Sequence, residues 1–133
     1  MFRRLILLLG ALCLSLSCNA LALDLAGRFG FAGEWSVHGS VNETAASSVL
    51  QREYSGKVRI NHTATCLPAG VEEKVGFLLM RQRLGSSRVR VTLTVDGTEC
   101  SFDGALSQVA TSFLKCPGDP TVPIYLWALI PLV

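Results

Sequence analysis

The chain has 133 residues, half of them hydrophobic, and its 12 lysines and arginines stand against 10 acidic residues. Two of the arginines lie within the first four residues, and without them the basic and acidic residues are equal in number. A general nucleic-acid binder keeps a strong positive excess, so this composition argues against nucleic acid as a partner.

The first segment has the pattern of a secretory signal peptide. A short start with Arg3 and Arg4 is followed by an apolar run from Leu5 to Leu16, and the small residues of Ala20-Leu-Ala22 suit a signal peptidase. We expect cleavage after Ala22, which makes residues 1–22 a signal peptide and residues 23–133 one domain. The alternative is a lipoprotein signal in which Cys18 is lipidated. Either route predicts an exported protein, periplasmic or secreted, or an outer-membrane lipoprotein if Cys18 carries lipid.

Three cysteines remain after such cleavage: Cys66, Cys100 and Cys116. An exported protein meets an oxidising compartment, which favours a disulfide, and the odd count leaves one cysteine over. There is no Cys-x-x-Cys motif and no histidine next to a cysteine, so the sequence predicts neither a metal site nor a cofactor.

The first half of the domain alternates polar and apolar residues in two segments. Gly33–Val41 and Tyr54–His62 each read as a half-buried strand, and the polar residues 42–48 between them read as a loop. The glycine-rich residues 26–33 read as a loop that leads into the first strand. Residues 71–84 are ambiguous between a helix and a strand, and we prefer a strand because a hairpin partner follows directly.

The second half contains the clearest signal, a hairpin from Ser87 to Phe102 that turns at Asp96-Gly97. Residues 104–114 read as a strand pair or a bent strand with a turn near Gln108, and residues 121–132 as a further strand. About seven short strands predict an all-β, single-domain antiparallel meander, either a small barrel or a sandwich.

A two-residue turn at Asp96-Gly97 sets the register of this hairpin. Leu93 then faces Cys100, Val91 faces Phe102, and Arg90 faces Asp103. Cys100 therefore points towards the core, and a turn centred on Gln108 would place it opposite Cys116. We predict a Cys100–Cys116 disulfide worth about 3 kcal/mol, with Cys66 unpaired. The alternative pairs Cys66 with either of the other two.

An even-length turn at Gly85-Ser86 creates a conflict of charge. It sets Arg83 opposite Arg88 and Arg81 opposite Arg90, and directly opposed like charges are destabilising. Either the turn has an odd length, or the four arginines form a patch for an anion. The patch would share its outer face with Phe77 and Leu79 and would suit a lipid headgroup, a glycan phosphate or an acidic protein. The alternative is a solvated face, with Asp103 as counter-ion and the C-terminal strand covering Phe77 and Leu79.

Nothing in the sequence predicts a catalytic residue. His38 and His62 lie on the polar sides of their strands with no carboxylate or cysteine at motif spacing, and no hydrolase, phosphate-loop or dinucleotide motif is present.

The triplet Gly33-Glu34-Trp35 on an early strand, followed by a meander, resembles the Gly-x-Trp opening of the lipocalin-like (calycin) barrels. The resemblance implies a closed barrel that holds or presents a ligand, with Trp35 as a core plug near one end. The segment Thr98–Gln108, together with Cys116, is also similar to small exported β-proteins of Gram-negative bacteria.

These observations predict a non-catalytic binding module of the cell envelope, whose partner is a lipid, a glycan or a protein. One alternative is a periplasmic inhibitor of a hydrolase such as a protease or lysozyme. The other is an enzyme of unknown class.

Overall fold

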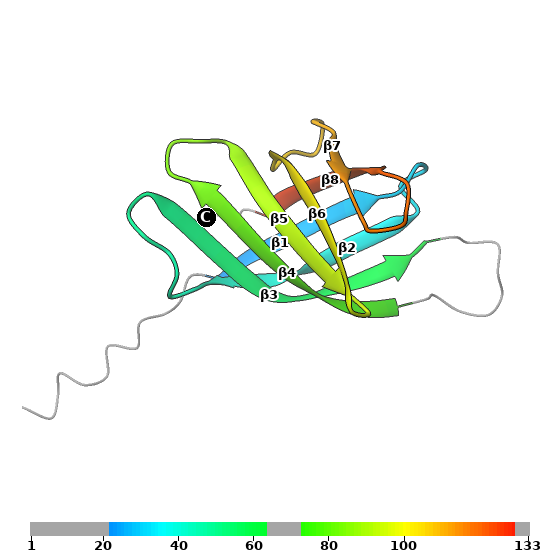
Figure 1. The fold of residues 1–133 in the computed structure, drawn as a ribbon, viewed down its shortest axis with the longest axis horizontal. Helices are drawn as coiled ribbons and strands as arrows, with labels where there is room; N and C mark the ends of the chain where they lie inside the picture. Colours follow the sequence, from blue (N-terminus) through cyan, green and yellow to red (C-terminus); the bar gives the residue numbers. More distant parts are fainter. Residues whose placement is uncertain (1–21, 64–72, 130–133) are drawn as a thin grey trace, which may run out of the picture.

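The structure is a computed structural model that describes residues 22–63 and 73–129. These residues form one antiparallel sheet of eight strands that curls into a nearly closed barrel (Figure 1). The strands are β1 (Ala22–Phe29), β2 (Trp35–Glu43), β3 (Gln51–His62), β4 (Glu73–Arg83), β5 (Arg88–Val95), β6 (Thr98–Ala105), β7 (Ser112–Leu114) and β8 (Val122–Leu129). The prediction of an all-β, single-domain meander is confirmed, with eight strands in place of about seven. Residues 1–21 of the predicted signal segment, which include Cys18, lie outside the described residues, as does Cys66.

The order of strands across the sheet is β6-β5-β4-β3-β2-β1-β8-β7. The two edge strands, β6 and β7, meet where Ser101 and Lys115 exchange two backbone hydrogen bonds of 2.9 Å each. The disulfide between Cys100 and Cys116 lies directly beside that bridge. Both features hold the barrel closed along a line that we call the seam.

One expectation about the N-terminal half is wrong. Residues 26–33 were expected to be a loop because of their glycines, yet β1 runs to Phe29 and pairs with both β2 and β8. Gly27 is buried in this strand, and a Cβ there would lie 2.6 Å from the carbonyl oxygen of Tyr125. The absence of a side chain at Gly27 therefore allows β8 to pack closely against β1, so this glycine serves strand packing and does not mark a loop.

The barrel interior is filled by side chains from every strand. The buried residues of this core are Leu25, Val37, Val41, Val58, Ile60, Leu78, Met80, Val89, Val91, Leu93, Cys100, Phe102, Leu114, Ile124 and Leu126. The ambiguous segment contributes with period two, because Leu78 and Met80 are buried whereas Val75 and Phe77 are exposed. That alternation confirms the strand and rules out the helix.

The hairpin of β5 and β6 has the predicted register. Asp96 and Gly97 both have positive φ, as the mirror-image two-residue turn requires. Leu93 pairs with Cys100 and Arg90 with Asp103, and the predicted Cys100–Cys116 disulfide is present. The strand pair expected after it is looser than predicted, because among the described residues Ser101–Lys115 is the only backbone pairing on this side of β6.

Gly104 of β6 lies against Ser112 of β7 across the seam. A Cβ at this position would collide with the side chain of Ser112, which is itself buried. We expect Gly104→Ala to lower the free energy of unfolding by about 1–3 kcal/mol through overpacking. The double variant G104A/S112G, which moves the small residue across the seam, should recover a large part of the loss in urea unfolding. Equal stability of G104A and the native chain would contradict this account of the seam.

Candidate anion-binding groove

The four arginines of the predicted patch lie around the hairpin that joins β4 to β5. Arg81 and Arg83 end β4, and Arg88 and Arg90 begin β5. Arg81 lies directly opposite Arg90, so the like-charge pair expected from the sequence is present. All four are exposed on the outer wall, and the side chains of Arg81, Arg88 and Arg90 have exposed fractions of 50%, 70% and 73%.

Two carboxylates flank this pair on the neighbouring strands. Across the sheet, Glu53 of β3 is opposite Arg81, and Asp103 of β6 is opposite Arg90. The row therefore reads acid, base, base, acid, which gives each central arginine an opposite charge on its outer side. Opposite charges at directly opposed cross-strand positions stabilise a sheet, whereas like charges there destabilise it.

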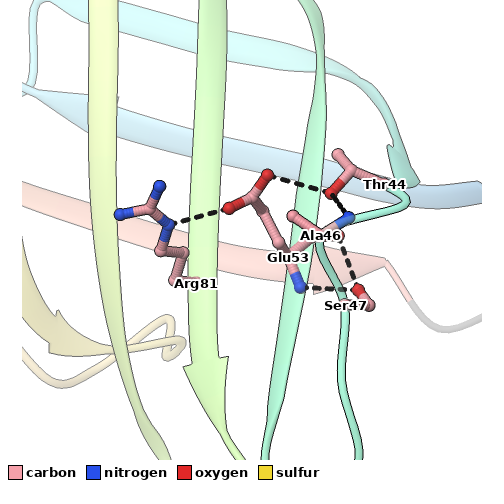
Figure 2. Close-up of polar contacts among 5 residues, drawn as sticks. All are labelled: Thr44, Ala46, Ser47, Glu53 and Arg81. Atoms are coloured by element: carbon pink, nitrogen blue, oxygen red, sulfur yellow. Dashed lines mark hydrogen bonds and ion pairs between the residues drawn. The ribbon is translucent and has the colours of Figure 1, made fainter.

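Glu53 is held firmly in place (Figure 2). Its carboxylate accepts a 2.8 Å hydrogen bond from Nε of Arg81 and a 2.9 Å hydrogen bond from the hydroxyl of Thr44. Its backbone N–H donates to the hydroxyl of Ser47 at 2.9 Å. The hydrogen bond from Arg81, followed by that from Thr44, lowers the pKa of Glu53 below its ordinary value. Glu53 thus positions Arg81 and, through Thr44 and Ser47, also holds the β2–β3 loop in place.

Asp103 is shared between two arginines. Its two oxygens lie 3.3 Å from Nη2 of Arg88 and 3.4 Å from Nη2 of Arg90. The hydrogen bond from Arg88 lowers the pKa of Asp103, and the hydrogen bond from Arg90 lowers it by a smaller amount. Among the described residues Arg83 has no ion pair, so four guanidinium groups meet two carboxylates. The cluster keeps an excess of two positive charges.

The lowered pKa values of Asp103 and Glu53 make stability depend on pH in a defined direction. Each folded-state pKa lies below the unfolded value, so the stabilisation is present at neutral pH and is lost as pH falls through the folded pKa. We expect the midpoint of urea unfolding to fall from about pH 5 downwards. The fall should be shallower in Asp103→Asn, and an identical pH profile for the two proteins would contradict the role given to Asp103.

Two adjoining grooves run along this wall. The smaller, of about 360 Å³, lies over the β4–β5 hairpin and is lined by all four arginines. The larger, of about 590 Å³, follows the seam. Both include Arg88, Arg90 and Asp103, so they form one continuous surface that we call the arginine groove. Beyond the predicted arginines the seam adds Lys115 and the hydroxyl groups of Thr92 and Ser101.

The apolar part of the predicted patch lies elsewhere. Phe77 is 49% exposed and Leu79 is half-buried on the same outer face, but neither lines the arginine groove. The idea that the C-terminal strand covers them is wrong, because β8 pairs with β1 and β7 on the other side of the barrel. Lys115 was missed because its place beside Arg88 and Arg90 depends on closure of the seam.

The Gly-x-Trp triplet lies at the opposite end of the barrel. Gly33 has a positive φ, the Glu34 carboxylate accepts a 2.9 Å hydrogen bond from the backbone N–H of Ala32, and Trp35 stacks on Phe29. His62 packs edge-on against Trp35 at a centroid distance of 4.5 Å. The triplet therefore forms the β1–β2 turn and packs beside the core.

No group of three or more metal-ligating side chains comes together within residues 22–63 and 73–129. In the same part of the chain there is no helix long and apolar enough to cross a membrane. Comparison with protein-family models, with curated proteins and with solved structures found no match to this chain.

Proposed function

We propose that this protein is an exported, non-catalytic binding domain whose arginine groove binds an anionic group of the cell envelope. The observation that carries the proposal is the directly opposed Arg81–Arg90 pair in a cluster with two more cations than anions. A bound phosphate or carboxylate would offset the remaining repulsion. Planar guanidinium groups suit such oxyanions because they donate two parallel hydrogen bonds.

The filled interior supports a site on the outer wall. A lipocalin-like barrel would hold its ligand inside, but here 15 buried core residues occupy that space. The Cys100–Cys116 disulfide is compatible with an oxidising, exported location. The carboxylate of Asp103 in this exposed groove is already paired with Arg88 and Arg90, and such an arrangement suits binding better than catalysis.

Binding of tripolyphosphate, a small soluble polyanion, tests the proposal. In calorimetric titrations at low salt, the double variant R83Q/R88Q should bind about tenfold more weakly than the native protein, because charge-assisted hydrogen bonds are lost. Arg59→Gln is the matched control, since Arg59 is 68% exposed on the outer wall of β3 away from the groove. Native affinity in R83Q/R88Q, or an equal loss in the control, would refute the proposed site.

Asp103→Asn should change affinity in the opposite direction. This substitution removes the carboxylate that both Arg88 and Arg90 contact, so an anion no longer competes with it. We expect tripolyphosphate to bind about two- to fivefold more tightly, as the modest strength of exposed ion pairs suggests. Weaker binding would mean that Asp103 orients the arginines rather than competing for them.

A further inference from the structure

Three loops at the arginine end of the barrel carry exposed apolar side chains at their tips. The β2–β3, β4–β5 and β6–β7 loops all emerge at this end, because Gln51 pairs with Arg83 and Arg88 pairs with Ala105 (Figure 1). Their tips hold Val49, Leu50, Leu84 and Val109, with exposed fractions of 85%, 73%, 61% and 88%. Burying a Leu or Val side chain is favourable, so an exposed group of four indicates an interaction surface.

We propose that this end docks onto an anionic lipid bilayer, with the apolar tips in the lipid and the arginines among the headgroups. This inference rests on the proposed function and names its ligand. Lipid is favoured over a soluble glycan or an acidic protein because cations and apolar tips occur together at one end. Apolar groups that penetrate the interface, backed by basic residues, are the pattern of surface-bound membrane proteins.

The tips and the arginines are connected in the structure. The backbone N–H of Leu84 donates a 2.9 Å hydrogen bond to the carbonyl of Leu50, so two of the tips belong to neighbouring, joined loops. Leu84 directly follows Arg83 in the chain, and Arg88 begins the next strand. Apolar and basic groups are therefore neighbours at the β4–β5 hairpin.

The spacing along the strands fits the depth of a lipid headgroup layer. A strand advances about 3.3 Å per residue, so Arg81 and Arg90 lie about 7 Å behind the positions of Arg83 and Arg88. Interfacial apolar groups enter the bilayer by about 5–10 Å. With the tips inserted to that depth, Arg83 and Arg88 would reach the phosphates, and the second pair would follow just above them.

The opposite end of the barrel has a different character. Its described loops contain one large exposed apolar residue, Phe31, and more acidic than basic residues, namely Glu34, Asp96 and Asp119 against Lys115. The described chain also enters and leaves at the arginine end, because β1 begins at Ala22 and Leu129, which ends β8, pairs with Asp24.

Vesicle binding tests this inference separately from the proposed function. The probes are vesicles of phosphatidylcholine alone and vesicles that also contain about 30 mol% phosphatidylglycerol, an anionic lipid. All protein variants are prepared with the same N-terminus. The tip variant L50S/L84S/V109S should lose about tenfold or more in affinity for anionic vesicles but keep native tripolyphosphate affinity. The matched control F31S/V75S replaces two apolar residues, 72% and 60% exposed, away from this end and should bind vesicles normally. R83Q/R88Q should bind both tripolyphosphate and anionic vesicles more weakly than the native protein.

The possible failures differ. Native vesicle affinity in the tip variant would overturn the membrane inference, because the apolar tips would then contribute nothing to lipid binding. Tripolyphosphate binding without any vesicle binding would also overturn it and leave a glycan or acidic protein as the ligand of the same groove. Native tripolyphosphate affinity in R83Q/R88Q would overturn the proposed function itself. Vesicle binding that persists unchanged at high salt would also contradict the inference, because the headgroup contribution should be screened.

Discussion

Replacing both Cys100 and Cys116 with alanine is expected to lower the free energy of unfolding by about 3 kcal/mol. The bond closes a loop with a sequence separation of 16 residues, and removing it frees the unfolded chain. It also removes the covalent closure of the seam, where the Ser101–Lys115 bridge supplies only two backbone hydrogen bonds. Urea unfolding of the purified double variant measures the loss.

Reduction of the native protein provides the control for this prediction. Unfolding in the presence of a strong thiol reductant should give a stability close to that of C100A/C116A, because both lack the same bond. A loss below about 1 kcal/mol in either case would show that the seam does not depend on the disulfide. Destabilisation of the variant without an effect of the reductant would assign the loss to packing of the Cys100 side chain.

Leu78→Ala is expected to cost about 2–5 kcal/mol of unfolding free energy. Leu78 is 2% exposed in the centre of β4, where it pairs with Gly56 of β3 and with Leu93 of β5. The substitution would leave a cavity in a core that strands on all sides hold in position, so little relaxation can fill it. Thermal or urea unfolding checks the value.

The neighbouring residue supplies a matched control. Phe77 precedes Leu78 but points to the outer wall and is 49% exposed. Phe77→Ala should therefore cost about 1 kcal/mol or less, although it removes more atoms. Equal losses for the two variants would contradict the strand register of β4, which turns Leu78 inward and Phe77 outward.

Local patterns in the sequence predicted the features that depend on short separations. Asp96-Gly97 set the register of β5 and β6, which in turn placed Cys100 inward and Arg90 opposite Asp103. A turn centred near Gln108 then matched Cys100 with Cys116, in agreement with the disulfide. The Arg81–Arg90 opposition followed in the same way from the neighbouring hairpin.

Features that depend on barrel closure were not predictable in this way. The strand role of Gly27 requires knowledge that β8, about 100 residues later, lies against it. Glu53, which offsets the repulsion between Arg81 and Arg90 by pairing with Arg81, comes from another strand and is 28 residues away in the chain. The shared end of Leu50, Leu84 and Val109 likewise results from the order of the strands, since their local sequences resemble ordinary loops.

The most direct test of the anion site is to observe the arginine side chains themselves during binding. In a nitrogen-proton NMR titration with tripolyphosphate, we predict saturable shifts of the Nε–Hε signals of Arg83, Arg88 and Arg90. The corresponding signals of Arg28 and Arg59, on the outer wall away from the groove, should stay in place. Shifts of equal size at all five arginines, or none at the first three, would contradict the assignment of the arginine groove as the binding site.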